Sequence, residues 1–324
     1  MCGIIAYTGP KKAINVLLGG LESLEYRGYD SAGVSVLEHG NRIFTYRSAG
    51  KLKTLRTLIQ NAKSRSQLSG STGIGHTRWA THGSPNDKNA HPHCDCSGEI
   101  VVVHNGIVEN FSELRELLTS QGHKFTSETD SETIPHLIEQ FSQRGDSLEE
   151  AVRKTAVKIK GSNAVVAMSQ AEPGKIVALR LGNAGGIAIG HGKGEMFVAS
   201  DLPALIPNTT TISYLEGGEI AILDENSATF MNLEGESILK DPNKIEYDPI
   251  SITRGNYPHF MLKEINEQPE AIMSSLRGRL NLEKGIVALE QFPLSQKDII
   301  ALKKVVIVGM GTSLHAAMVA RYWI

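Results

Sequence analysis

The sequence predicts an α+β protein in which antiparallel sheets pack against layers of helix. Three observations predict this class. Short apolar runs punctuated by glycine alternate with amphipathic segments along the first two-thirds of the chain. Between residues 164 and 232 such runs follow one another through turn sequences such as Glu172-Pro173-Gly174-Lys175, which is typical of antiparallel strands. Helical segments bracket these strands, which indicates layers of sheet and helix.

The predicted strands are short and rich in apolar or β-branched residues. They are Gly3 to Thr8, Ala32 to Leu37, Arg42 to Tyr46, Thr72 to His76, Ile100 to His104, Ala164 to Met168, Ile176 to Arg180, Gly186 to Ile189, Met196 to Ala199, Glu219 to Leu223 and Ala228 to Asn232.

Three helices are predicted in the same region. Lys12 to Leu24 carries apolar residues at helical spacing, which gives one buried face. A second helix begins at Asn110, with Glu113 as the partner in a capping box, and stops at Gly122. A third begins with Ser147 and Glu150 in the same relation and ends at Gly161.

A domain boundary is predicted where residues 233–258 become polar and lose any sustained period. After it, Phe260 to Leu276 is predicted to be helical, and the β-branched run Val305 to Val308 leads through a glycine turn into a helix that runs to Ile324. This is one strand and one helix of a parallel sheet, which cannot cover both faces of a strand, so we expect most of a second domain to be absent. The predicted division is 2–235, a linker at 236–258, and 259–324.

Composition excludes several classes of protein. Of the 324 residues 40% are hydrophobic and 21% charged, which is ordinary for a soluble globular protein. With 33 Lys and Arg against 35 Asp and Glu, no basic stripe predicts a nucleic-acid partner. We expect no membrane span, no secretory signal and, with 3 cysteines, a reducing cytoplasm.

Cys2 is a candidate nucleophile. Removal of the initiator Met would make it N-terminal, so that its own α-amine, which titrates near pH 7.7 to 8.0 in model peptides, can accept the thiol proton. One residue then supplies nucleophile and base. The alternative is that Cys2 is simply a small buried residue.

An acyl-transfer site also needs oxyanion donors and a clamp for the charged end of the substrate. Asn105 and Gly106 emerge together at a predicted strand end and are candidate donors, although an Asn-Gly pair is also typical of a turn. Arg78 is a candidate for a carboxylate and Asp130 for an ammonium group. As single residues, both are also compatible with a solvated surface or a helix cap.

Several motifs, in order along the chain, resemble one family. They are Met1-Cys2-Gly3-Ile4, Glu25-Tyr26-Arg27-Gly28-Tyr29-Asp30-Ser31-Ala32-Gly33, the run from His76 to Gly83, Asn89-Ala90-His91-Pro92-His93 and His104-Asn105-Gly106. They resemble the glucosamine-6-phosphate synthase family, the isomerising glutamine:fructose-6-phosphate aminotransferases. The resemblance covers the chain from end to end.

The resemblance implies an N-terminal-nucleophile hydrolase fold, a four-layer αββα sandwich, followed by a linker and the first strand-helix unit of an α/β sugar isomerase domain. It implies that Cys2 attacks the amide of L-glutamine, that Asn105 and Gly106 hold the oxyanion, and that Arg78 and Asp130 bind the carboxylate and amino group. The resemblance also implies that Trp79, Thr81 and His82 complete the glutamine pocket. It implies that Arg27 helps to organise the end of the chain that carries the nucleophile, and that His91 lies in the loop linking the glutamine site to the sugar domain.

In that family the released ammonia converts fructose 6-phosphate to glucosamine 6-phosphate. Gly311, Thr312 and Ser313 match its first sugar-phosphate-binding unit, and a glycine turn opening a helix offers N–H and hydroxyl donors to a phosphate. A dinucleotide fingerprint is the rival, but Leu314 takes the place of the third glycine. Because the expected sequence beyond residue 324 is missing, only glutamine hydrolysis is expected of this chain. Full-length members are typically homodimers.

Three alternatives stay open. Amidophosphoribosyltransferases and asparagine synthetases share the Cys2-Gly3-Ile4 opening, although His259 to Ile265 and the following Glu267-Gln268-Pro269 favour the aminosugar family. A catalytically idle glutamine-binding or dimerising module is the non-enzyme alternative. The segment from His91 to Cys96 gathers imidazoles and thiols, but its spacing is wrong for a zinc hook, so we expect neither metal nor cofactor.

Overall fold

The computed structural model describes residues 2–38, 40–61, 68–80, 82–183, 185–245, 257–276, 279–281, 286–287, 294–309 and 311–323. It divides the chain into two compact units, residues 1–255 and 256–324. In the described ranges no helix is long and apolar enough to cross a bilayer.

The first unit contains two antiparallel sheets. The order in the larger sheet is β15-β11-β9-β10-β1-β4-β2-β3, and in the smaller one β14-β13-β12-β8-β7-β6-β5. The strands are β1 Gly3–Thr8, β2 Ser31–Glu38, β3 Arg42–Ala49, β4 Thr72–Arg78, β5 His93–Cys94, β6 Ile100–Gly106, β7 Asn163–Ser169, β8 Ile176–Leu181, β9 Ala188–His191, β10 Met196–Ala199, β11 Thr211–Tyr214, β12 Glu219–Leu223, β13 Ala228–Asn232, β14 Ser237–Ile238 and β15 Asn243–Lys244.

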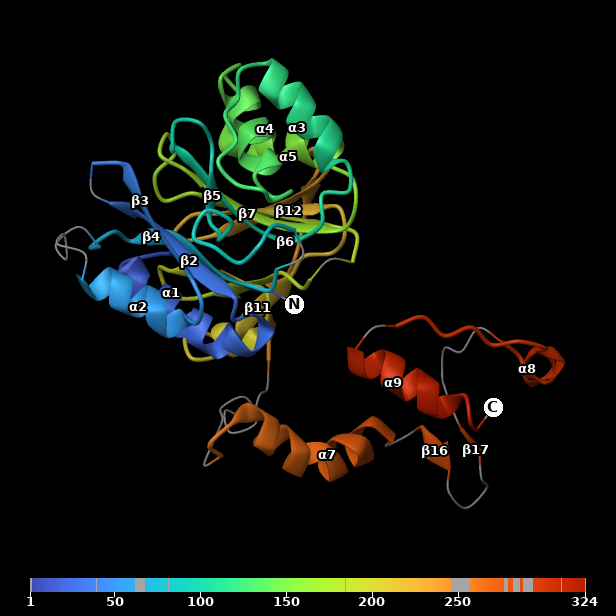
Figure 1. The fold of residues 1–324 in the computed structure, drawn as a ribbon. Helices are drawn as coiled ribbons and strands as arrows, with labels where there is room; N and C mark the ends of the chain where they lie inside the picture. The colour runs from blue at the N-terminus through green and yellow to red at the C-terminus, as the bar shows by residue number, and fades with distance from the viewer. Residues whose placement is uncertain are drawn as a thin grey trace. The chain divides into compact units, whose positions relative to one another are not determined.

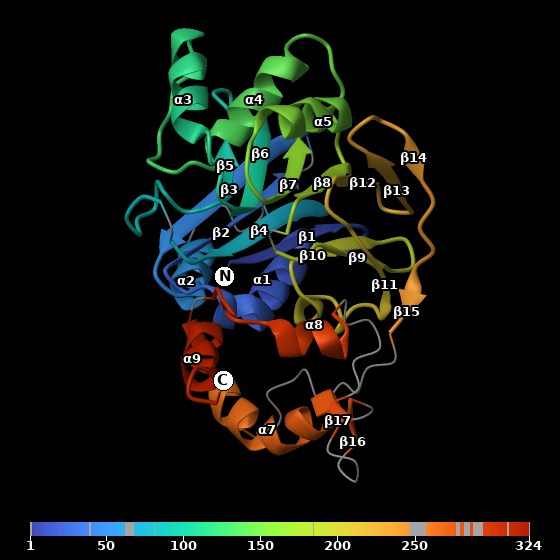
Figure 2. The same cartoon turned by 90° about the vertical axis from the view of Figure 1, so that its right-hand side faces the viewer.

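Helices cover the outer faces of both sheets. Those of the first unit are α1 Ala13–Leu24, the short η1 Glu25–Arg27, α2 Leu52–Asn61, α3 Phe111–Ser120, α4 Thr133–Ser142, α5 Leu148–Lys158 and the short η3 Leu202–Ala204. Figures 1 and 2 show α1 and α2 on the side of the larger sheet and α3, α4 and α5 on the side of the smaller one.

The alternation of side chains between the two faces of each strand explains why the first unit has four layers. In β1, Ile4 faces the core between the sheets while Ile5 packs with α1. In β6, Val101 faces the other sheet while Val102 packs with α3, α4 and α5. Because successive side chains of a strand point to opposite faces, both sheets are apolar on both sides. The arrangement is the predicted four-layer αββα sandwich of the N-terminal-nucleophile hydrolases.

All of the predicted strands of the first unit are present, most with ends shifted by one to three residues. The predictions omitted α2, α4 and the short strands β5, β11, β14 and β15. Strand β14 pairs with β13 and β15 pairs with β11, so the segment predicted to be a linker begins as part of the two sheets.

Both predicted capping boxes are wrong. Asn110 makes no cap bond, because its side chain instead bridges the Lys158 carbonyl oxygen at 3.0 Å and the Lys160 N–H at 2.8 Å. Ser147 also makes no cap bond, and the Glu150 carboxylate is bound by Arg153. The Asn110 side chain is thus bound by a distant segment, and the Glu150 side chain by a residue one turn further along the same helix.

The second unit contains α7 Phe260–Leu276, β16 Leu280–Asn281, β17 Ile286–Val287, α8 Gln296–Ala301 and α9 Gly311–Ala320. The predicted helix at Phe260 to Leu276 is confirmed. The predicted strand at Val305 to Val308 is wrong, because these residues pair with no strand among those described. A strand needs a neighbour to satisfy its N–H and C=O groups, and the helix that follows forms without that requirement.

Candidate active site

Cys2 lies immediately before β1, in the middle of the larger sheet. Gly3 pairs with Thr77 of β4, so the thiol reaches the residue that follows β4. The Trp79 N–H donates to Cys2 Sγ at 3.2 Å, and Sγ lies 3.5 Å from the Trp79 carbonyl oxygen. Burial raises the pKa of the Cys2 thiol above its ordinary value. The thiol is therefore protonated at neutral pH and needs a base before it can act as a nucleophile.

Two side chains from distant parts of the chain hold the backbone of Cys2. Arg27 Nε donates to the Cys2 carbonyl oxygen at 3.1 Å, and Asn105 Nδ2 donates to the same oxygen at 3.2 Å. Arg27 is buried and its Nη1 also pairs with Asp201 Oδ2 at 2.5 Å. The structure thus brings Cys2, Arg27 and Asn105 together, and the roles that the resemblance implies for them stay predictions.

His76 fixes the orientation of the Asn105 amide. Its Nε2 lies 3.0 Å from Asn105 Oδ1 and 3.1 Å from the His104 carbonyl oxygen. Both partners accept, so Nε2 carries a proton and turns Asn105 Nδ2 toward Cys2. Burial lowers the pKa of His76 to about 3, which keeps the ring neutral. The sequence alone does not predict this role, because a single His inside a strand carries no distinguishing pattern.

For the glutamine hydrolysis that the motif resemblance implies, we expect His76→Phe to lower the turnover number about 10- to 100-fold, the range for losing the orientation of one positioned donor. KM for glutamine should change little. His76→Gln, which keeps a donor at a similar distance, should restore part of the activity. Steady-state kinetics of the three proteins check this, and equal losses in His76→Phe and His76→Gln would contradict it.

Gly106 ends β6 beside Asn105. Its φ of +135° lies where side chains are rarely accommodated, and a Cβ there would meet the Ser162 carbonyl oxygen at 2.3 Å. Backbone and packing therefore both demand glycine at this position. The residue is exposed, which leaves room next to Asn105 for a ligand.

The Arg78 guanidinium has one buried nitrogen that the described residues leave unpaired. Its side chain is buried, and Nη2 donates to the carbonyl oxygens of His82 and of Gly83, the latter at 3.1 Å. Nη1 is buried and has no hydrogen-bond partner among the described residues. An unpaired buried guanidinium nitrogen is costly unless an anion completes it.

Aromatic rings flank this region. Trp79 is half exposed and meets Tyr29 edge-on with 5.6 Å between ring centroids, and the His82 ring lies 5.4 Å from Phe111. Tyr29, Asp30, Trp79 and Ala80 line a cavity of about 210 Å³. Thr81 lies outside the described residues.

Asp130 is buried close to the end of β6. Its Oδ2 accepts the Val108 N–H at 2.8 Å, two residues beyond Gly106. The next residue, Ser131, contacts His104 Nδ1 of β6 at 2.8 Å. Asp130 is therefore held against the segment that follows the predicted oxyanion donors.

His91 lies just before β5 and packs in a buried group of three imidazoles. Its ring centroid is 4.1 Å from that of His76 and 4.5 Å from that of His93. Burial holds the pKa of His91 well below its usual value. His91 thus packs against the residue that orients Asn105, and its predicted role in linking two sites stays a prediction.

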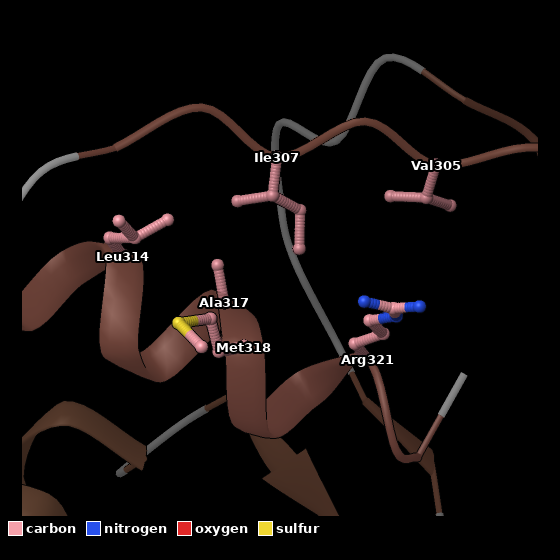
Figure 3. A pocket seen from close by; sticks show the side chains of 6 residues that line it. All are labelled: Val305, Ile307, Leu314, Ala317, Met318 and Arg321. Atoms are coloured by element: carbon pink, nitrogen blue, oxygen red, sulfur yellow. The ribbon is translucent and has the colours of Figure 1, made fainter.

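The predicted sugar-phosphate residues Gly311, Thr312 and Ser313 begin α9 in the second unit, and all are exposed. A cavity of about 370 Å³ lies between the extended stretch before α9 and the helix itself (Figure 3). Its lining is apolar apart from Arg321, with side chains from Val305, Ile307, Leu314, Ala317 and Met318. The predicted phosphate site stays a prediction.

The segment from His91 to Cys96 does not form one ligand cluster. Cys94 is half-buried and its Sγ lies 4.0 Å from Thr45 Oγ1. Cys96 instead meets His123, His136 and Glu139, which the spacing within the segment could not reveal.

The first unit matches a known domain family. Residues 76–207 match the family model described as "Glutamine amidotransferase domain". Among solved structures, the fold resembles a glutamine phosphoribosylpyrophosphate amidotransferase from B. subtilis, with a TM-score of 0.61, 24% identity and coverage of 72% of this chain and 49% of that one. A second, titled as the allosteric regulatory enzyme of purine biosynthesis, gives a TM-score of 0.62 at 25% identity, with coverage of 72% and 49%.

Curated relatives match along the entire chain. A protein of Symbiobacterium thermophilum is 46% identical over 324 residues and one of Aquifex aeolicus is 45% identical, and both are named glutamine--fructose-6-phosphate aminotransferase [isomerizing]. Each match takes in 100% of this chain and 52% of the relative, so the chain spans about half the length of the curated relatives it matches. The resemblance inferred from the motifs is confirmed.

Proposed function

We propose that the first unit hydrolyses L-glutamine to glutamate and ammonia, with Cys2 as the nucleophile. Once Met1 is removed, the α-amine of Cys2 takes the thiol proton, and the thiolate forms a bond to the amide carbon. The amine returns the proton to the leaving nitrogen, so ammonia departs and a thioester remains. Water then cleaves the thioester, which releases glutamate and restores the thiol.

The observation that carries this proposal is the hydrogen bond from Asn105 Nδ2 to the Cys2 carbonyl oxygen. It brings the ends of β1 and β6, 103 residues apart, to one point. An Asn amide has two N–H groups, so one can hold the Cys2 backbone while the other faces an oxyanion. Gly106, where no side chain fits, supplies a backbone N–H beside it. An acyl-transfer site needs this pairing of nucleophile and donors.

For the substrate's charged end, we assign the carboxylate to Arg78 and the ammonium group to Asp130. Nη1 of Arg78, which has no partner in the part of the chain that the structure describes, supports the first assignment, and the position of Asp130 beyond Gly106 supports the second. Trp79, Thr81 and His82 would complete the pocket.

The names of the curated relatives suggest the fate of the ammonia. We propose that it aminates fructose 6-phosphate in a protein containing both this chain's second unit and the remaining half of the relatives' length. Gly311, Thr312 and Ser313 would begin the phosphate site. The domain division, the cytoplasmic location and the homodimer stay predictions.

The test is release of glutamate and ammonia from glutamine by the purified chain, with and without fructose 6-phosphate, together with an assay for glucosamine 6-phosphate. We expect glutamate without aminosugar. Glutamine binding without turnover would overturn the proposal and favour an idle binding module. Turnover that depends on phosphoribosyl diphosphate would favour the amidophosphoribosyltransferases.

We expect Arg78→Lys to raise KM for glutamine about 10- to 100-fold with a smaller change in the turnover number. Lysine keeps the charge but loses the planar fork that meets a carboxylate with two N–H groups, a difference of about 1.5 to 3 kcal/mol for hydrogen bonds to charged groups. The measurement is steady-state kinetics, with Arg115→Lys as a matched control outside the site. A lowered turnover number at unchanged KM would contradict the assignment.

A further inference from the structure

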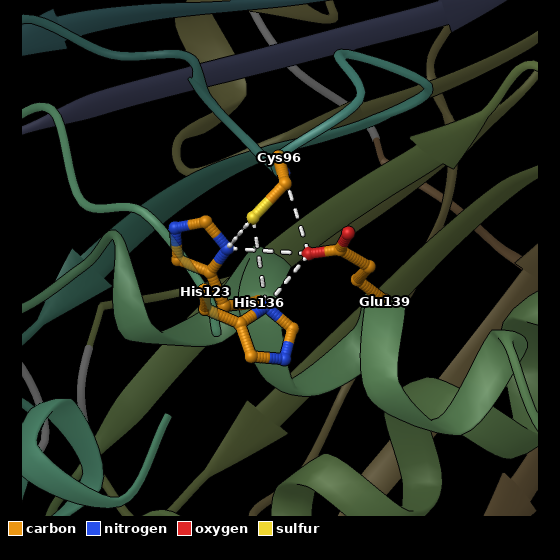
Figure 4. A group of neighbouring side chains, drawn as sticks. All are labelled: Cys96, His123, His136 and Glu139. Carbon is orange, nitrogen blue, oxygen red and sulfur yellow. Dashed lines mark hydrogen bonds and ion pairs between the residues drawn. The ribbon is translucent and has the colours of Figure 1, made fainter. Parts of the chain in front are cut away.

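Four side chains with metal-binding atoms converge on the outer side of the smaller sheet. They come from three separate places, with Cys96 in the turn after β5, His123 after α3, and His136 and Glu139 one turn apart on α4. One ligand atom from each lies within 4.8 Å of all the others. Figure 4 shows both imidazole Nδ1 atoms, the thiol and one carboxylate oxygen facing a common centre.

The separations match the edges of a tetrahedron around zinc. Zn–S bonds of about 2.3 Å and Zn–N or Zn–O bonds of about 2.0 to 2.1 Å at tetrahedral angles give S···N edges of about 3.6 Å and N···O edges of about 3.3 Å. Cys96 Sγ lies 3.6 Å from His123 Nδ1 and 3.5 Å from His136 Nδ1. Glu139 Oε2 lies 2.9 and 3.3 Å from the same two nitrogens. Of these four of the six edges, only the one between Glu139 Oε2 and His123 Nδ1 would need to widen, by a few tenths of an ångström, and the remaining two lie within the 4.8 Å that holds for all four ligand atoms.

The charges also suit a divalent ion. One thiolate, one carboxylate and two neutral imidazoles around Zn²⁺ sum to zero, which a mostly buried site tolerates. The side chains of His123, His136 and Glu139 are 9%, 1% and 8% exposed. Cys96 is exposed, which gives the ion a path from solvent. Mixed sulfur and imidazole ligands favour zinc over magnesium or calcium.

Surrounding groups hold the ligands in place. The Lys124 N–H donates to Cys96 Sγ at 3.4 Å, as expected for a group that stabilises a thiolate. His136 Nε2, on the far side of the ring, is buried without a hydrogen bond among the described residues, and the Glu132 carboxylate lies 3.9 Å away. A carboxylate behind a ligating imidazole is a common outer partner in zinc sites.

We propose that Cys96, His123, His136 and Glu139 bind one Zn²⁺ as a closed structural site. The spacing within residues 91–96 predicts no metal, because three of the four ligands lie outside that segment. The site joins the turn after β5 to α4, whose first residue follows Asp130 by three positions. Zinc would thus hold the helical layer against the sheet edge, independently of glutamine chemistry. The competing arrangement is a metal-free network in which Glu139 Oε2 accepts from both imidazoles and from the Cys96 N–H at 3.3 Å.

Metal content decides between the two arrangements. The full chain is produced in zinc-supplemented medium, desalted, and measured by inductively coupled plasma mass spectrometry. We expect about one zinc per chain, falling at least tenfold in Cys96→Ser and in Glu139→Gln. Cys94→Ser is the matched control two residues away, and Cys2→Ala excludes the other thiol; both should keep the full zinc content.

Two further readouts keep the test decisive if one variant folds poorly. Apoprotein prepared with a chelator should regain thermal stability with added Zn²⁺, because an ion that binds only the folded state raises the melting temperature. Co²⁺ in its place should give a thiolate-to-metal absorption band, which Cys96→Ser loses. Zinc below about 0.1 per chain after supplementation, or zinc content unchanged in both Cys96→Ser and Glu139→Gln, would overturn the proposal.

Discussion

Replacing Cys2 with alanine is expected to abolish glutamate release, with a loss of about 10⁴-fold or more. The thiol forms the bond to the substrate in the proposed reaction, and no other group of the site can substitute for a missing nucleophile. The fold should survive, because within the described residues the hydrogen bonds of the thiol are to the Trp79 backbone, and the residue precedes β1. We expect a change in unfolding free energy within about 1 kcal/mol.

The measurement combines a coupled glutamate assay with circular dichroism and thermal melting of the same samples. Cys94→Ala is the matched control, since Cys94 is a half-buried free thiol outside the site. It should keep wild-type turnover. Activity of Cys2→Ala within tenfold of the wild type would remove Cys2 from the mechanism, whereas loss of activity together with loss of fold would show that Cys2 also has a structural role.

The strands of the first unit could be predicted because the sandwich buries them on both faces. β1 and β6 therefore each carry a run of consecutive apolar residues, which distinguishes them from their flanks. The missed elements lack that contrast. β14 and β15 are two residues long and depend on partners already in the sheet. Helix α4 carries buried His136 and Glu139, so its apolar stripe is interrupted.

The candidate site could likewise be predicted from the sequence only in part. Asn105 and Cys2 could each be singled out from the sequence, but local pattern does not report the bond between them. Their pairing was implied only through the resemblance. His76 and the zinc-ligand cluster were missed for the same physical reason, since both depend on side chains brought together from separate elements. In the second unit, the β-branched run at 305–308 has strand propensity but no paired strand among the described residues.

Asn105→Ala is expected to lower the turnover number about 10²- to 10³-fold, equivalent to about 2.7 to 4 kcal/mol, with KM for glutamine nearly unchanged. A donor to the oxyanion acts mainly in the transition state, so its loss appears in the turnover number. Asn226→Ala, in an exposed turn, is the matched control and should be silent.

The double variant His76→Phe with Asn105→Ala tests how the two residues are connected. If His76 acts only by orienting the Asn105 amide, its replacement has nothing left to disturb once that amide is gone. The double variant should then be as slow as Asn105→Ala alone, rather than slower by the further factor that independent sites would add. Additive losses would show that His76 acts on the reaction by another route, and a raised KM in Asn105→Ala would show that Asn105 binds the ground state of glutamine.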